Sequence, residues 1–207
     1  WTAVEIIAEV APETLVMPRK DSYFGPDCAF SVLCEKNQLD SFDKLIDIVP
    51  MTNSIANHCA YEATSNFHFE LVERIVDKGF DFGHVEDDAE KSYWRSPLYV
   101  SAGTKYDKTT GQCILYPFEF TKYLFEKTDN LVLRGRALAS ASGAGNIKVV
   151  KLILNWLSND LFLQDTDAYI AFRGAALRCA AQSRRFDIVE LILPASTELP
   201  FYQRDAI

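Results

Sequence analysis

Residues 137–154 read ALASASGAGNIKVVKLIL, and they contain two helical segments separated by a short turn. The first segment is rich in Ala, Ser and Gly, whereas the second carries large apolar residues at its first, fourth, seventh and eighth positions. That spacing places the apolar residues on one face of a helix. Gly145 and Asn146 are residue types that favour a turn between two helices. The stretch therefore predicts a helix–turn–helix unit with one apolar face.

The apolar pattern of the second segment recurs along the chain. Four further stretches align with it without gaps: FDKLIDIV at 42–49, FELVERIV at 69–76, FEFTKYLF at 118–125 and FDIVELIL at 186–193. The five starting residues lie 27, 49, 29 and 39 positions apart. A two-helix unit of this size cannot bury its own apolar face, so neighbouring units must stack and share one elongated core. We therefore predict an all-α fold, an α-solenoid, with second helices near 42–49, 69–78, 118–127, 147–157 and 186–193.

The composition is that of a globular chain and excludes several classes of function. The 207 residues are 48% hydrophobic and carry a formal net charge of −8. This charge, without any run of more than two basic residues, argues against nucleic acid as a partner. The longest apolar stretches have about eight residues, against the ~18 that a membrane span requires. Five cysteines without a C-x-x-C pair favour a reducing compartment, the cytoplasm.

The repeated units resemble the ankyrin repeat, whose pattern is T-P-L-H-x-A-A, two variable positions, G-H and an apolar second helix. SPLYVSA at 96–102 is similar to the first motif, and ALASASGAGN at 137–146 matches the spacing together with its turn. AALRCAAQSRRF at 175–186 has two arginines in place of Gly-His, and no repeat keeps the full T-P-L-H motif. The resemblance covers about residues 28–195, and it implies stacked helix–turn–helix repeats with irregular finger loops between them.

The two ends of the chain fall outside this array. Residues 1–27 are predicted to form an N-terminal helix, either a partial or capping repeat or an unrelated helix packed over the end of the stack. Residues 196–207 are predicted to be a C-terminal tail. Because the chain opens at Trp1 without Met, we expect it to be part of a larger protein.

The resemblance implies that a partner contacts the finger loops. The finger at 80–95, FDFGHVEDDAEKSYWR, places Tyr93, Trp94 and Arg95 just before the SPLYVSA motif. These three residue types are enriched at binding hot spots. The alternative is that the aromatic side chains pack within the loop and hold it together.

Two further irregular segments supply candidate contacts. The segment 103–117 is about eleven residues longer than the family spacing and contributes Lys105 and Tyr106. The alternative for this insertion is a solvated excursion that turns at residues 109–111. The segment 158–173 is predicted to be a finger and contributes Phe172 and Arg173.

In the family, the two variable positions of each first helix face the binding groove. In this sequence they map onto Ser65 and Asn66, Gly103 and Thr104, Gly143 and Ala144, and Gln182 and Ser183. Such small, neutral side chains make an uncharged floor, and we expect a peptide or protein surface to bind there.

No catalytic, cofactor-binding or metal-binding constellation is found in the sequence. Asp81-Phe82-Gly83 spells a kinase magnesium motif, but the Gly-rich loop and the catalytic loop are absent. The Gly-Ala-Gly at 143–145 lacks the third glycine and the preceding strand of a dinucleotide fingerprint. The three histidines and their neighbouring cysteines lack zinc-ligand spacing.

We therefore expect a non-catalytic protein–protein interaction domain, a scaffold, adaptor or targeting module that binds its partner through its concave face and finger loops. The alternative is an intramolecular regulatory or substrate-docking module of a larger enzyme or effector, packed on a neighbouring domain of its parent chain. In the ankyrin family, degenerate arrays also occur in effectors that intracellular bacteria deliver into the host cytosol.

Overall fold

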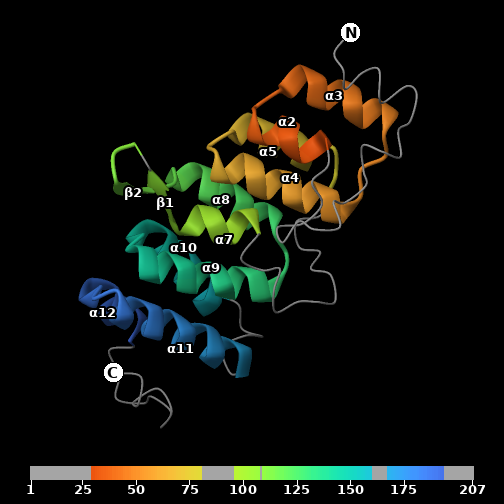
Figure 1. The fold of residues 1–207 in the computed structure, drawn as a ribbon. Helices are drawn as coiled ribbons and strands as arrows, with labels where there is room; N and C mark the ends of the chain where they lie inside the picture. The colour runs from red at the N-terminus through yellow and green to blue at the C-terminus, as the bar shows by residue number, and fades with distance from the viewer. Residues whose placement is uncertain (1–28, 81–95, 108, 160–166, 194–207) are drawn as a thin grey trace, which may run out of the picture. The chain divides into compact units, whose positions relative to one another are not determined.

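A computed structural model describes residues 29–80, 96–107, 109–159 and 167–193 (Figure 1). These ranges contain ten helices and one two-stranded sheet, so the prediction of a mainly helical fold is confirmed. The chain divides into two compact units, Trp1–Pro97 and Leu98–Ile207. No helix within the described ranges is long and apolar enough to cross a membrane.

Four helices make up the described part of the first unit: α2 (Ala29–Glu35), α3 (Leu39–Ile48), α4 (Asn53–Ser65) and α5 (Phe69–Asp77). Helix α2 packs on α3, α4 packs on α5, and α2 and α4 also lie against each other. The buried rings of Phe30 and Phe42 meet edge to face, with their centroids 5.8 Å apart. Arg74 Nη1 donates to Asp43 Oδ2 at 2.9 Å and joins α5 to α3. The unit consists of two helical hairpins side by side.

The second unit repeats this arrangement over more elements. They are α7 (Pro97–Ala102), β1 (Thr104–Asp107), β2 (Gln112–Leu115), α8 (Phe118–Lys127), α9 (Leu131–Ala144), α10 (Ile147–Asn159), α11 (Asp167–Gln182) and α12 (Phe186–Ile192). Helices α8, α10 and α12 form an outer row in which α10 packs on both neighbours. Helices α7, α9 and α11 form an inner row (Figure 1). Helix α9 begins where the Asn130 side chain accepts a hydrogen bond from the Leu133 N–H at 3.1 Å, an N-cap.

One type of turn joins the two helices of four hairpins. The residue two positions before the second helix has a positive φ in each: Asn37 (55°), Phe67 (63°), Gly145 (80°) and Arg184 (56°). The N–H of the following residue donates to the carbonyl five positions earlier, at 2.9 Å in all four. This bond is the mark of the Schellman motif, which satisfies a carbonyl at the helix end. Four hairpins therefore share one backbone conformation.

The residue after the positive-φ position links each hairpin to the one before it. His68 Nδ1 donates to the Cys34 carbonyl at 2.9 Å, and Asn146 Nδ2 donates to the Ala102 carbonyl at 3.4 Å. Arg185 Nη2 donates to the Ala144 carbonyl at 3.5 Å. In all three the acceptor lies near or at the end of the first helix of the preceding helix pair, α2, α7 or α9, so one side chain fastens each of these hairpins to the pair before it.

Replacing Arg184 by Gly is expected to raise the free energy of unfolding by about 0.5–1 kcal/mol. A side chain with a Cβ atom is strained at positive φ, whereas Gly adopts this conformation readily, and this gain outweighs the extra freedom of Gly in the unfolded chain. Urea denaturation of the full chain measures the change. Arg184→Ala is the control, because it removes the guanidinium but keeps Cβ. An equal rise in the free energy of unfolding for Arg184→Ala would show that the guanidinium charge, rather than the positive φ, destabilises the wild-type chain.

The buried face of the outer helices differs from the predicted stripe. The third and seventh positions are buried in the last four repeats: Leu71 and Ile75, Phe120 and Leu124, Val149 and Ile153, and Ile188 and Ile192. The first position was predicted to face the core, yet the Ile147 and Phe186 side chains are 36% and 68% exposed. A first residue lies roughly 115° around the helix from the centre of the face made by positions three, four and seven. The fourth position is a buried Thr in α8, Thr121, whose hydroxyl donates to the Ser101 carbonyl.

The predicted register of the first repeat is wrong by three residues. Its turn lies at Asn37 and Gln38, so helix α3 begins at Leu39 rather than Phe42. Phe42 and Leu45 then occupy the fourth and seventh positions, and both are buried. The alignment equated Phe42 with residues that begin a helix, whereas Phe42 is the fourth residue of α3 and packs in the core.

The insertion at 103–117 is a β-hairpin, which departs from the all-α prediction. Strands β1 and β2 pair antiparallel, with Thr104 opposite Leu115 and Asp107 opposite Gln112. At the tip, the Asp107 carboxylate accepts hydrogen bonds from the Thr109 hydroxyl and N–H and from the Thr110 hydroxyl. These bonds, that of the Thr109 hydroxyl first, lower the pKa of Asp107 from 3.8 to about 2. Thr, Tyr and Ile favour strands in this segment, and no apolar helical face competes with them.

The predicted finger at 158–173 is also corrected. Helix α10 continues to Asn159 and α11 begins at Asp167, so Phe172 and Arg173 are helical. The Phe172 ring lies directly against Gly135 of α9. Arg173 donates to the Tyr169 hydroxyl at 2.5 Å and to the Ile192 carbonyl at the end of α12. Both side chains hold helices of the second unit together.

Candidate functional site

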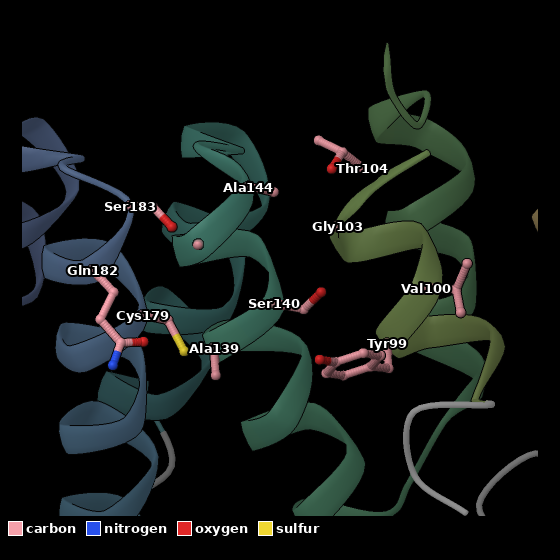
Figure 2. Close-up of a pocket in the computed structure, with 11 residues that line it drawn as sticks. Tyr99, Val100, Gly103, Thr104, Ala139, Ser140, Ala144, Cys179, Gln182 and Ser183 are labelled. Atoms are coloured by element: carbon pink, nitrogen blue, oxygen red, sulfur yellow. The ribbon is translucent and has the colours of Figure 1, made fainter. Parts of the chain in front are cut away.

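A pocket of about 440 Å³ opens between helices α7, α9 and α11 of the second unit (Figure 2). Residues from the last turn or two of each helix, and from the one or two positions after α7 and α11, line it: Tyr99, Val100, Gly103, Thr104, Ala139, Ser140, Gly143, Ala144, Cys179, Gln182 and Ser183. The pocket is therefore built from equivalent ends of three successive inner helices.

Small residues set the spacing of these helix ends. A Cβ atom on Gly103 would lie 2.8 Å from Ser140 Oγ, so α7 and α9 approach closely only without it. A Cβ atom on Gly143 would lie 3.6 Å from both Cys179 Cβ and Ser183 Oγ, an ordinary contact. Figure 2 shows the Tyr99 ring reaching from α7 towards α9, while the Ser140 hydroxyl points from α9 towards α7.

The lining is polar but carries no charged side chain. Hydroxyls come from Tyr99, Thr104, Ser140 and Ser183, and an amide comes from Gln182. Hydroxyl and amide groups donate and accept hydrogen bonds, as a peptide backbone does. The Cys179 thiol has no histidine or carboxylate beside it among the lining residues. In the described ranges, no three His, Cys, Asp or Glu side chains cluster as a metal site would require.

The structure brings four of the predicted contact residues together. Thr104, Ala144, Gln182 and Ser183 all line the pocket, with the neighbouring Gly103 and Gly143.

The remaining predicted contacts lie elsewhere. Ser65 and Asn66 end helix α4 in the first unit, where Asn66 Nδ2 donates to the Glu62 carbonyl at 2.9 Å. Tyr93, Trp94 and Arg95 lie outside the described residues.

The other two predicted contacts, Lys105 and Tyr106, lie on opposite faces of the β-hairpin. Side chains alternate along a strand, so Tyr106 shares a face with Thr104, whereas Lys105 is on the opposite face. The Tyr106 side chain is 60% exposed, and Leu115, opposite Thr104, is 45% exposed. Because Thr104 lines the pocket, this apolar hairpin face continues from the pocket edge.

Five lining residues were not predicted: Tyr99, Val100, Ala139, Ser140 and Cys179. Each lies four positions before a residue that was predicted to face the groove. Residues four apart occupy the same helix face. Extending the predicted pairs by one turn towards the N-terminus identifies all five.

Comparison of the chain with protein-family models, with curated proteins and with solved structures found no match in any of the three.

Proposed function

We propose that this chain is a non-catalytic protein-interaction domain built of ankyrin-like repeats, and that the inner helices of its second unit bind an extended segment of a partner protein. The observation that carries the proposal is the pocket, because equivalent positions of α7, α9 and α11 converge on it. A surface repeated from one helix to the next suits a ligand that crosses several helices.

The four identical turns support the repeat assignment. In the ankyrin pattern, a Gly-His pair separates the two helices of a repeat. Here Phe67-His68, Gly145-Asn146 and Arg184-Arg185 occupy that place, with the first residue at positive φ. The second residue of each pair makes the bond to the preceding inner helix. These pairs therefore make the same turn and the same bond to the neighbouring helix, even where their residue types differ from Gly-His.

The dimensions and chemistry of the pocket favour an extended peptide. Packed helices lie 8–10 Å apart, so a ligand that crosses three of them spans roughly 16–20 Å. An extended chain covers that distance with about six residues at ~3.3 Å each. The lining hydroxyls and the Gln182 amide match the hydrogen-bonding groups of such a backbone.

Selection of a phage-displayed library of random twelve-residue peptides on the full 207-residue chain tests the proposal. We expect peptides that bind the wild-type chain and lose binding at least tenfold with Ala139→Phe, whose ring fills the pocket. Lys151→Phe, on the exposed side of α10, places the same ring elsewhere and leaves binding unchanged.

Gln182→Ala provides a second pocket variant that adds no bulk, since Gln182 is exposed at the rim. Thermal unfolding of each variant separates a lost contact from a lost fold. The proposal is wrong if no peptide is enriched, or if folded Ala139→Phe and Gln182→Ala chains bind the selected peptides as the wild type does.

A further inference from the structure

The inner helices of the second unit are basic, although the chain as a whole carries a net charge of −8. Helices α7, α9 and α11 together contain four arginines, Arg134, Arg136, Arg173 and Arg178. Their single acidic residue is Asp167, the first residue of α11. It lies fifteen positions before Gln182, about 22 Å along the helix at 1.5 Å per residue. The pocket end of these helices therefore has no acidic side chain of its own.

Two of these arginines fasten helices within the unit. The Arg134 guanidinium lies 4.7 Å from the Phe125 ring centroid and 4.8 Å from that of Trp156, and it donates to the Phe125 carbonyl. Arg173 is bound to Tyr169 and to the Ile192 carbonyl. Neither group is positioned to contact a ligand in the pocket.

Other arginines border the pocket at both ends of its α11 lining. Arg178 is exposed, directly precedes Cys179 and lies one helical turn before Gln182. No ion pair within the described ranges involves Arg178.

At the other end of the α11 lining, the exposed Arg184 follows Ser183. The Arg185 guanidinium lies against Gly145 and donates to the carbonyl of Ala144, a lining residue. The uncharged pocket thus has positive charges along one side, at α11 and the turn that follows it.

We propose that the partner segment is acidic at one end: its neutral residues cross α7 and α9 in the pocket, and Asp or Glu side chains where it crosses α11 pair with Arg178 or with Arg184 and Arg185. The inference rests on the proposed function and adds the chemistry of the partner. Carboxylates are the planar anions that a guanidinium recognises with two hydrogen bonds. Such charges at the rim of an interface mainly guide association and exclude wrongly charged partners.

An acidic peptide fits this site better than nucleic acid. Single-stranded nucleic acids bind grooves that combine continuous positive charge with several stacked aromatic residues. Here Tyr99 is the one aromatic residue among the lining side chains, and the positive charges lie along the α11 side rather than along the floor. A twelve-nucleotide oligothymidylate is therefore expected to bind at least tenfold more weakly than the selected peptides.

The peptides selected on the wild-type chain test the inference. We expect them to carry Asp or Glu at one end, next to a neutral stretch. Arg178→Glu and Arg185→Glu should each weaken the binding of a synthetic selected peptide about fivefold, the upper range for an exposed ion pair. Lys151→Glu makes the same charge change on α10 and should leave binding unchanged. Raising salt should weaken wild-type binding more than that of the double arginine variant.

The outcomes separate this inference from the function on which it rests. The acidic partner would be overturned if the selected peptides have no acidic excess and their binding is unaffected by both arginine reversals. If Ala139→Phe still abolishes their binding, the peptide-binding function stands. Failure to enrich any peptide would overturn both. If oligothymidylate bound more tightly than every selected peptide, the proposed partner would be a nucleic acid and not an acidic peptide.

Discussion

Gly135→Ala is expected to lower the free energy of unfolding by about 2 kcal/mol. A Cβ atom on this buried residue of α9 would overlap Cγ, Cδ1 and Cε1 of Phe172 on α11. Since Cγ is close to the α11 backbone, the ring has little room to move away, and the two helices must separate. Overpacking of this kind costs about 1–3 kcal/mol, more than the gain of up to ~1 kcal/mol from replacing a helical glycine. Urea denaturation of the full chain measures the difference.

Gly143→Ala is the matched control on the same helix. Its Cβ atom would make only ordinary contacts, at 3.6 Å, with Cys179 and Ser183. We expect no loss of stability, and a gain of up to ~1 kcal/mol. Equal destabilisation by both substitutions would contradict the close approach of α9 and α11 at Gly135.

Ile188→Ala is expected to destabilise the chain by about 3 kcal/mol, within the 2–5 kcal/mol of buried Ile truncations. Ile188 is fully buried at the third position of α12. Phe186→Ala, two residues earlier, should cost less than about 0.5 kcal/mol, because the Phe186 side chain is 68% exposed. Thermal and urea unfolding of both variants measure the contrast. If Phe186→Ala destabilised the chain more than Ile188→Ala, the first position would face the core, as the sequence predicted.

The sequence located most of the outer helices but misjudged which side chains they bury. Helices α5, α8, α10 and α12 begin at Phe69, Phe118, Ile147 and Phe186, the first residues of the predicted ranges. A large apolar residue has the same hydrophobicity whether it is the exposed first residue of a helix, as Phe186 is, or the buried fourth residue, as Phe42 is. Only the turn that precedes the helix fixes the register, and the positive-φ positions at Asn37 and Arg184 carry no glycine to reveal it.

Two segments with weak periodic signals differ from the sequence predictions, although the turn expected at residues 109–111 is present. No strand was predicted at β1 and β2, because the hairpin depends on pairing between two segments, such as Thr104 with Leu115. Helix α11 spans Asp167–Gln182, and its residues Phe172 and Arg173 pack on Gly135 and bind the end of α12, contacts that sequence spacing does not express.

The candidate site was predicted in part because it depends on repeated positions. Residues such as Thr104 and Gln182 were found by mapping a helix-end position from repeat to repeat, and the structure places them in one pocket. Tyr99 and Ser140 were missed because only the end of each helix was mapped, whereas the pocket extends one turn further towards the N-terminus of the helix. Arg184 and Arg185 were noted as standing in place of Gly-His, and Arg178 was not identified, because their position beside the pocket depends on how neighbouring helices pack.

The most direct test of the proposed binding surface is to add a selected peptide to the uniformly ¹⁵N-labelled chain and follow its amide resonances by NMR. The proposed function predicts that the largest changes gather at pocket residues on the three inner helices, such as Gly103, Ser140 and Ser183. Changes confined to the outer helices or to the first unit would contradict it.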